Sequence, residues 1–314
     1  MKVLVVGAGG IGGHVGGRLL EAGADVTFLV RPRRRAQLER DGLRVTSPLG
    51  DISAPVRTVL ASELEAGFDL AILTCKSYDL DAAMTDLAPA MDGSCVVIPL
   101  LNGMAHLDAL DARFGATHVW GGTTAMSVTL EAGGTVRHEG KWARVVVGER
   151  GGPPSPGAEA FGALLARTKL ASELSPRIEQ DMWEKVVNLS AIAALTCLFR
   201  ASLGEIARSP GGPESAERVL ATNIAIATCE GFPPRPNAIA LTRKMLGDRD
   251  STLTSSMLRD LEGGGPVEAD HIVGWMLHRA RKHALDDTVL ALAYTHLKAY
   301  EARRAAGRNS PGPS

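Results

Sequence analysis

The beginning of the chain holds the feature that most restricts its fold, a glycine-rich turn directly after a short apolar run. Residues 2–6 read KVLVV, a pattern typical of a buried parallel strand, and residues 7–12 read GAGGIG. In this G-x-G-x-x-G pattern the first glycine permits a tight turn, the second lets the backbone approach a pyrophosphate, and the third lets the following helix pack closely. We therefore predict a unit that binds a dinucleotide with its phosphates at the helix N-terminus. The predicted phosphate-binding residues are Gly7, Ala8, Gly9, Gly10, Ile11 and Gly12.

Arg31 indicates which dinucleotide is bound. The first helix is predicted to end near Gly23, and a second strand is expected at 25–30. The acidic residue that would hydrogen-bond the ribose of NAD is absent after this strand, which leads to Arg31 instead. An arginine in this place accommodates a 2′-phosphate, so the pattern predicts NADPH. The alternative is that Arg31 and the arginines at 33–35 form only a solvated surface.

Composition restricts the class of protein. A length of 314 residues with 45% hydrophobic content suffices for two domains, and a net charge of −1 argues against a nucleic-acid partner. The four cysteines form no C-x-x-C pair, which favours a reducing, cytoplasmic setting without zinc or disulfides. Only one Glu-x-x-His occurs, at 268–271, so we predict no metal. No apolar run looks long enough for a membrane span, and the chain opens on a strand rather than a signal peptide.

Strands and helices alternate in the first half of the chain. Apolar runs at 68–75 and 95–101 flank a helical stretch at 79–90, which is the rhythm of a parallel sheet. A helix at 104–113 follows. The later strand candidates, which we expect to extend the sheet in antiparallel fashion, are 123–130, 135–139 and 144–148, with an edge strand at 169–174.

Strand signals stop after residue 174. Ser175 is a good N-cap and Pro176 suits the first helical position, so a long helix is expected from there to about Phe199. The other predicted helices are 204–208, 213–230, 236–246, 256–262, 268–283 and 288–305. The predicted fold is thus α/β plus all-α, with a Rossmann-type N-terminal domain at 1–174, a helical domain at 175–305 and a disordered tail at 306–314.

Three segments place polar residues at otherwise apolar positions. Residues 100–104 read LLNGM at the end of a predicted strand, residues 183–188 read WEKVVN, and residues 255–260 read SSMLRD ahead of Glu268. A nicotinamide enzyme that reduces a carbonyl needs a proton donor at the developing alkoxide and groups that hold the substrate. These segments are the candidates.

Together with the glycine-rich turn, these segments resemble the ketopantoate reductase (2-dehydropantoate 2-reductase) family over nearly the whole chain. The resemblance implies NADPH-dependent reduction of a 2-keto acid, with ketopantoate as the named candidate. It assigns Lys185 as the general acid and Glu268 as its paired carboxylate. It also implies that Asn102 contacts the substrate or nicotinamide, that Ser256 binds the substrate carboxylate, and that Lys76 lies on the cofactor side.

The chain departs from the family at two positions. The family places asparagines four and eight residues after the catalytic lysine, where this chain has Leu189 and Ala193. Asn188 is adjacent and is kept as a candidate substrate-binding residue, although one residue turns a side chain about 100° around a helix. A less polar 2-oxo acid or another carbonyl compound is therefore the alternative substrate.

Each candidate residue also has a structural interpretation. Lys185 could extend along an apolar helix to solvent, Asn102 could belong to a plain Asn-Gly turn, Ser256 could be a helix N-cap, and Glu268 could favour a helix dipole. In that case the chain could be an NADPH-binding redox sensor without turnover. The expected partners are a small 2-keto acid and, as a possibility, a second copy of the chain.

Overall fold

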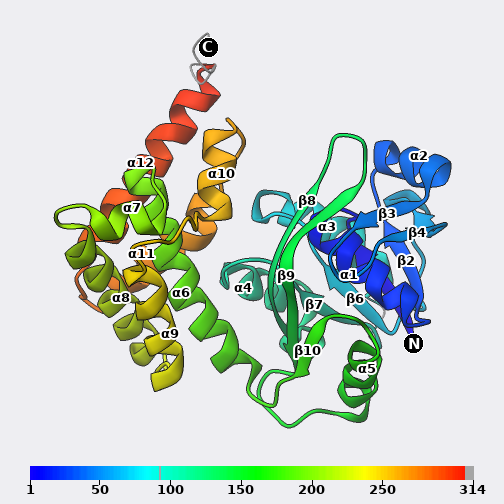
Figure 1. The fold of residues 1–314 in the computed structure, drawn as a ribbon. Helices are drawn as coiled ribbons and strands as arrows, with labels where there is room; N and C mark the ends of the chain where they lie inside the picture. The colour runs from blue at the N-terminus through cyan, green and yellow to red at the C-terminus, as the bar shows by residue number, and fades with distance from the viewer. Residues whose placement is uncertain (92, 308–314) are drawn as a thin grey trace. The chain divides into compact units, whose positions relative to one another are not determined.

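The computed structural model describes residues 1–91 and 93–307, and the chain divides into two compact units (Figure 1). The first unit contains Met1–Leu101 and His106–Asp181, and the second contains Asn102–Ala105 and the chain from Met182 onward. Most of the predicted disordered tail, residues 308–314, lies outside the described residues.

The first unit contains a parallel five-stranded sheet in the order β5-β2-β1-β6-β7. Its strands are β1 (Lys2–Val6), β2 (Asp25–Leu29), β5 (Arg57–Val59), β6 (Leu70–Leu73) and β7 (Val96–Pro99). The chain winds from β1 to β2 on one side and continues through β6 and β7 on the other, so the strand order reverses beside β1. Ligands of such sheets bind outside the carboxyl ends of the strands at this switch point.

A second sheet stands where the sequence predicted an extension of the first. Its strands are β3 (Leu43–Thr46), β4 (Ile52–Ala54), β8 (Gly121–Leu130), β9 (Val136–Gly148) and β10 (Ala171–Leu174). The β8–β9 pair is antiparallel as predicted, but β3 and β10 pair with β9 in parallel. The prediction of a single extended sheet was wrong because β3 and β4 were missed. Strands of three or four residues show too little alternation to be recognised.

The two strands predicted at 135–139 and 144–148 are one strand with a bulge. The register of β8 with β9 jumps between Met126 and Ser127, which pair with Ala143 and Glu139. The three intervening residues, Gly140 to Trp142, project from the ladder, and Trp142 is 77% exposed. The polar, glycine-containing interruption was therefore correctly located but marks a bulge rather than a strand end.

Helix α1 (Gly10–Glu21) packs against strands of both sheets. A Cβ added at Gly16 would lie 2.6 Å from the ring of Phe28 on β2, and one at Gly17 would lie 3.0 Å from Ile52 on β4. Every residue of α1 from Gly12 to Leu19 is buried. Glycines on two faces of the helix thus allow both sheets to approach it closely.

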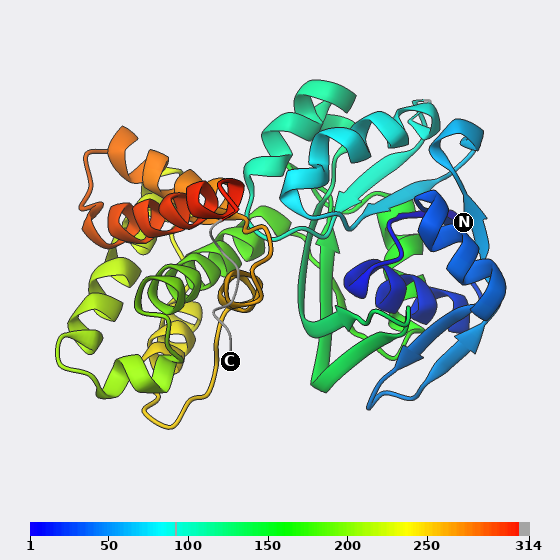
Figure 2. The same ribbon diagram turned by 90° about the horizontal axis from the view of Figure 1, so that it is seen from above.

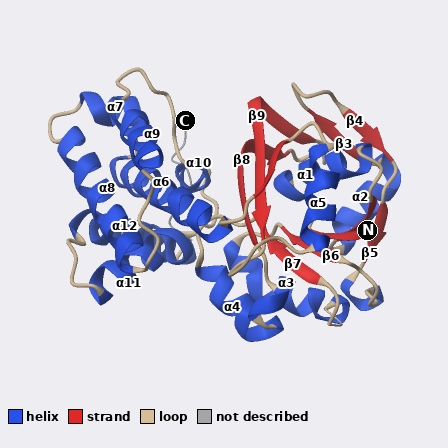
Figure 3. Cartoon of the chain, turned by 90° about the horizontal axis from the view of Figure 1, so that it is seen from below, coloured by secondary structure: helices blue, strands red, loops and turns tan. Residues whose placement is uncertain are grey.

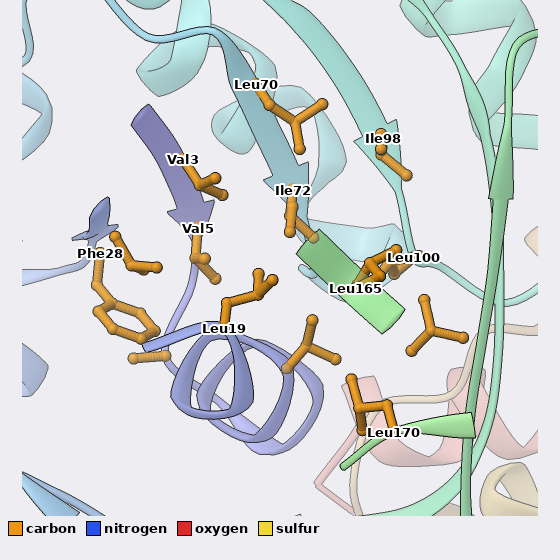
Figure 4. Close-up of a cluster of buried hydrophobic side chains, with 14 of the residues drawn as sticks. Val3, Val5, Leu19, Phe28, Leu70, Ile72, Ile98, Leu100, Leu165 and Leu170 are labelled. Atoms are coloured by element: carbon orange, nitrogen blue, oxygen red, sulfur yellow. The ribbon is translucent and has the colours of Figure 1, made fainter. Parts of the chain in front are cut away.

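Apolar side chains of both sheets and the helices between them form one core (Figure 4). Leu19 of α1 points toward Val5 and Ile72 of the parallel sheet, while Leu165 and Leu170 complete the cluster from the other side. The remaining helices of this unit are α2 (Pro32–Asp41), α3 (Leu80–Leu87), α4 (Ala105–Phe114) and α5 (Pro156–Ala166).

In the described residues the second unit is helical, as predicted (Figure 3). Its helices are α6 (Ile178–Phe199), α7 (Leu203–Arg208), α8 (Gly212–Cys229), α9 (Pro236–Gly247), α10 (Ser256–Glu262), α11 (Trp275–Lys282) and α12 (Thr288–Ala305). Figures 1 and 2 both show α6, drawn in green, running among the later helices. The helix predicted at 268–283 contains a π-helical turn, Asp270–Gly274, before α11.

The start and the character of α6 also differ from prediction. The helix begins at Ile178 instead of Pro176, because the Ser175 hydroxyl accepts from the Arg177 amide in a turn and donates to Asp181. By length and composition α6 could cross a membrane, contrary to the expectation that no run was long enough. However, 67% of the 18-residue apolar stretch of α6 that is long enough to do so is buried inside the protein. Packing within the helical unit thus accounts for its apolar residues.

The packing of α1 generates the first prediction. Gly16→Val should lower the free energy of unfolding by about 1–3 kcal/mol, because the new side chain overlaps the Phe28 ring in a filled core. Gly157→Val on α5 is the control, since a Cβ there meets only an ordinary contact with Ser155. Urea unfolding of both variants measures the difference. Equal stability of the two variants would show that α1 has room to shift.

Candidate functional site

The glycine-rich turn has the geometry that the motif predicts. Gly7 has φ = +97°, a conformation that favours glycine, and a Cβ at Gly12 would lie 2.0 Å from the Gly7 carbonyl oxygen. At Gly9 an added Cβ would meet no atom within 4 Å. The turn is therefore closed toward the protein at Gly12 and open at Gly9, where a ligand can approach the backbone.

The helix that follows the turn can receive an anion. Gly9 is the N-cap of α1 and offers no side chain to the first amide groups of the helix. Such amides, aligned with the helix dipole, favour a phosphate. The amide groups at the N-terminus of α1 therefore fit the pyrophosphate of a dinucleotide.

Two residues that sequence reasoning missed hold the turn in place. The Thr74 hydroxyl, after β6, donates to the carbonyl of Val6 at 2.9 Å. Arg34 donates from Nε to the carbonyl of Ala8 at 3.0 Å and from Nη1 to that of Gly134 at 2.9 Å. The sequence allows Arg34 to belong to a solvated run of arginines, but Arg34 lies on α2 and joins the turn to the β8–β9 connection. Only tertiary contacts distinguish it from its neighbours.

Arg31 lies where the sequence placed it, just after β2, and it has an acidic partner. Its Nη2 donates to Oδ1 of Asp79 at 2.7 Å, and this hydrogen bond raises the pKa of the guanidinium. Asp79 ends a short 3₁₀ turn, Ser77–Asp79, which Lys76 precedes as N-cap. The two predicted cofactor-side cations thus follow the strands on either side of β1.

The second unit brings Lys185, Asn102 and Glu268 together. Lys185 is half-buried on α6, and its Nζ donates to Oδ1 of Asn102 at 3.2 Å. Burial lowers the pKa of Lys185 to about 8, while the attraction of Glu268 opposes this shift. Glu268 is itself only 6% exposed. A lysine with this pKa exchanges its proton near neutral pH, which a solvated surface lysine does not.

The Asn102 turn is fixed by close packing against the segment that carries Glu268. Gly103 has φ = +79°, and a Cβ there would lie 2.8 Å from the carbonyl oxygen of His271. His271 belongs to the π-helical turn Asp270–Gly274, which begins two residues after Glu268. The Asn-Gly pair is therefore a turn, and its asparagine also hydrogen-bonds the Lys185 ammonium group.

The candidate substrate residues outside this cluster differ in position. The N-cap of α10 is Ser255, whose buried hydroxyl accepts from the Leu258 amide at 3.0 Å, so the alternative role suggested for Ser256 was wrong. Ser256 is the first residue of the helix and is half-buried. Asn188 donates to the Thr242 hydroxyl of α9 at 3.1 Å and is not joined to Lys185. The amide of Asn188 thus serves the contact between α6 and α9.

The two positions that depart from the family lie on the helix of Lys185. Leu189 and Ala193 follow it at spacings of four and eight residues, which places all three along one side of α6. Leu189 is half-buried and Ala193 is 1% exposed. This side of the helix therefore presents apolar groups beside the lysine.

Comparison with known proteins identifies the family. The model of ketopantoate reductase PanE/ApbA matches residues 3–152, and that of its C-terminal domain matches residues 177–301. An uncharacterized oxidoreductase of Bacillus subtilis, YkpB, is 35% identical over 97% of this chain and 100% of its own length. The 2-dehydropantoate 2-reductase of Archaeoglobus fulgidus is 30% identical over 92% of this chain and 94% of its own.

A solved structure shows the same fold. The structure of D-mandelate dehydrogenase with NADH and anilino(oxo)acetate has a TM-score of 0.86 at 21% identity, covering 97% of this chain and 99% of that chain. It resembles this chain across both the sheet-containing and the helical unit. With the family models and the relatives, the resemblance inferred from the motifs is confirmed: the chain belongs to the ketopantoate reductase family of oxidoreductases.

Proposed function

We propose that the protein reduces a 2-keto acid to the 2-hydroxy acid with NADPH. The observation that carries this proposal is the Lys185 cluster, in which a lysine with a lowered pKa is held by Asn102 beside a buried glutamate. A redox sensor needs only the dinucleotide end of the chain, and nothing in that role calls for such a lysine.

The first unit supplies the groups that fit the cofactor. The amides at the start of α1 would bind the pyrophosphate, the open side of Gly9 admits it, and Arg31 would contact a 2′-phosphate. Lys76 would lie on the same side. When bound, the cofactor supplies a hydride to the carbonyl carbon of the substrate.

Lys185 provides the proton. As the carbonyl carbon accepts the hydride, its oxygen gains negative charge and takes a proton from the Lys185 ammonium group, which solvent later restores. Glu268 favours the ammonium form by its charge. Asn102 orients Nζ through their hydrogen bond, and the Ser256 hydroxyl would bind the substrate carboxylate.

The apolar side of α6 favours a substrate less polar than ketopantoate. The side chains of Leu189 and Ala193 would offer no hydrogen bond to a hydroxyl in the tail of the keto acid, and a buried hydroxyl without a partner costs about 1–3 kcal/mol. The structural neighbour named D-mandelate dehydrogenase has the same fold and an aromatic 2-hydroxy acid in its name. Ketopantoate is the family's substrate, and an aliphatic or aromatic 2-oxo acid is the second candidate.

Replacing the lysine tests the chemistry. Lys185→Ala should lower kcat by about 10²–10⁴, the range expected for loss of a general acid, and leave the fold and the affinity for NADPH unchanged. Lys244→Ala, which removes an exposed lysine of α9, is the control. Turnover with a panel of 2-oxo acids, circular dichroism and cofactor titration provide the measurements. Near-native turnover of the Lys185 variant would show that Lys185 is not the general acid and serves only in packing.

The pKa of Lys185 predicts the pH dependence. Only the ammonium form donates a proton, so kcat/KM for reduction should fall as the pH rises through about 8. Because Glu268 raises this pKa, Glu268→Gln should move the fall to lower pH. Rate profiles of this variant are compared with those of Glu262→Gln, an exposed acid of α10. If Glu268→Gln does not change the pH at which kcat/KM falls, electrostatic coupling between Glu268 and Lys185 is excluded.

A double substitution tests the substrate. Leu189→Asn with Ala193→Asn should raise kcat/KM for ketopantoate relative to 2-oxoisovalerate, because a site discriminates a hydroxyl strongly only when it offers that hydroxyl a partner. Leu292→Asn on α12, an exposed leucine, is the control. If the native enzyme already prefers ketopantoate strongly, other residues bind the hydroxyl and the less polar substrate is excluded.

A further inference from the structure

Arg31 and Asp79 meet across the carboxyl end of β1. In the parallel sheet β1 lies between β2 and β6, and its last residue, Val6, pairs with Leu29 on one side and Leu73 on the other. Arg31 follows β2 and Asp79 follows β6, so the hydrogen bond between them, 2.7 Å long, bridges the two neighbours of β1. The chain leaves β1 between them through Gly7.

This ion pair stands at the point where the proposed cofactor must pass. The sheet reverses its strand order beside β1, and a dinucleotide whose pyrophosphate lies at Gly9 extends its adenosine half toward the end of β2. The ribose attached to the adenine would then lie near Arg31 and Asp79 together. Both side chains are accessible, at 69% and 36% exposure, and an exposed pair of this kind opens at little cost.

The two possible ribose groups would respond to Asp79 in opposite ways. A 2′-phosphate would compete with the Asp79 carboxylate for one guanidinium and would be repelled by it. A 2′-hydroxyl can instead donate a hydrogen bond to a carboxylate, which is the role of the acidic residue that binds the ribose of NAD in other proteins of this fold. That acid is missing after β2, and Asp79 supplies a carboxylate from the 3₁₀ turn that follows β6.

We propose that Asp79 determines specificity for the 2′ group of the cofactor by occupying Arg31 and offering a carboxylate to a ribose hydroxyl. The protein then accepts NADH as well as NADPH, because Arg31 favours the phosphate and Asp79 opposes it. This inference rests on the dinucleotide site of the proposed function but on neither the lysine chemistry nor the identity of the keto acid.

Asp79→Asn removes the charge and keeps the shape of the side chain. It should strengthen NADPH binding by about tenfold, the effect of one nearby repulsive charge, and should weaken NADH binding. Asp81→Asn is the matched control, because Asp81 is an exposed acid two residues further on, in the first turn of α3. Thermal unfolding of both variants checks that the fold is intact.

Dissociation constants of the full-length protein are measured by calorimetry for NADPH, NADH, 2′,5′-ADP and 5′-AMP. The two adenosine phosphates report the 2′ group without the nicotinamide. The inference is supported if Asp79→Asn, but not Asp81→Asn, increases the affinity for NADPH relative to NADH and for 2′,5′-ADP relative to 5′-AMP. If these affinity ratios do not change in a folded Asp79→Asn variant, or if they change equally in Asp81→Asn, the inference is overturned. The proposed reductase function is not affected by that result. Failure of the native protein to bind either dinucleotide overturns both.

Discussion

The packing of α1 between two sheets is the constraint on which the fold and the dinucleotide end of the site depend. Its glycines let Phe28 approach from one sheet more closely than a Cβ at Gly16 would allow, and let Ile52 approach from the other to a distance that would be tight for a Cβ at Gly17. The helix is thereby held along its buried length, from Gly12 to Leu19. Its N-terminus is fixed at the end of β1, and a rigid helix end can present amide groups to a phosphate without further ordering.

Charged side chains organise the surroundings of that helix end in two ways. Arg34 donates hydrogen bonds to main-chain carbonyls of the turn and of the β8–β9 connection, and it thereby holds these two segments together. Arg31 pairs with Asp79 in a more exposed position. Neighbouring arginines of one run therefore have different roles, and the depth at which each lies decides which role it takes.

In the helical unit, burial and the charge of Glu268 act in opposite directions on the pKa of Lys185. Removing an ammonium group from water lowers its pKa, here to about 8, and the carboxylate of Glu268 opposes this shift. The Asn102 turn contributes a hydrogen bond from a part of the chain that precedes α6 by many residues. The close contact of Gly103 with His271 holds this turn to the Glu268 segment.

Short-range patterns in the sequence determined the strand–turn–helix unit, the division into a sheet-containing and a helical part, and most helix boundaries, because each depends on a few consecutive residues. The family motifs likewise identified Lys185 and Glu268 as candidates. Only the tertiary structure decided that β3 and β4 build a second sheet, that Asn102 belongs with the helical unit, and that Arg31 has Asp79 as its partner. These are contacts between residues far apart in the chain, and their formation depends on how whole elements pack rather than on the preferences of the residues themselves.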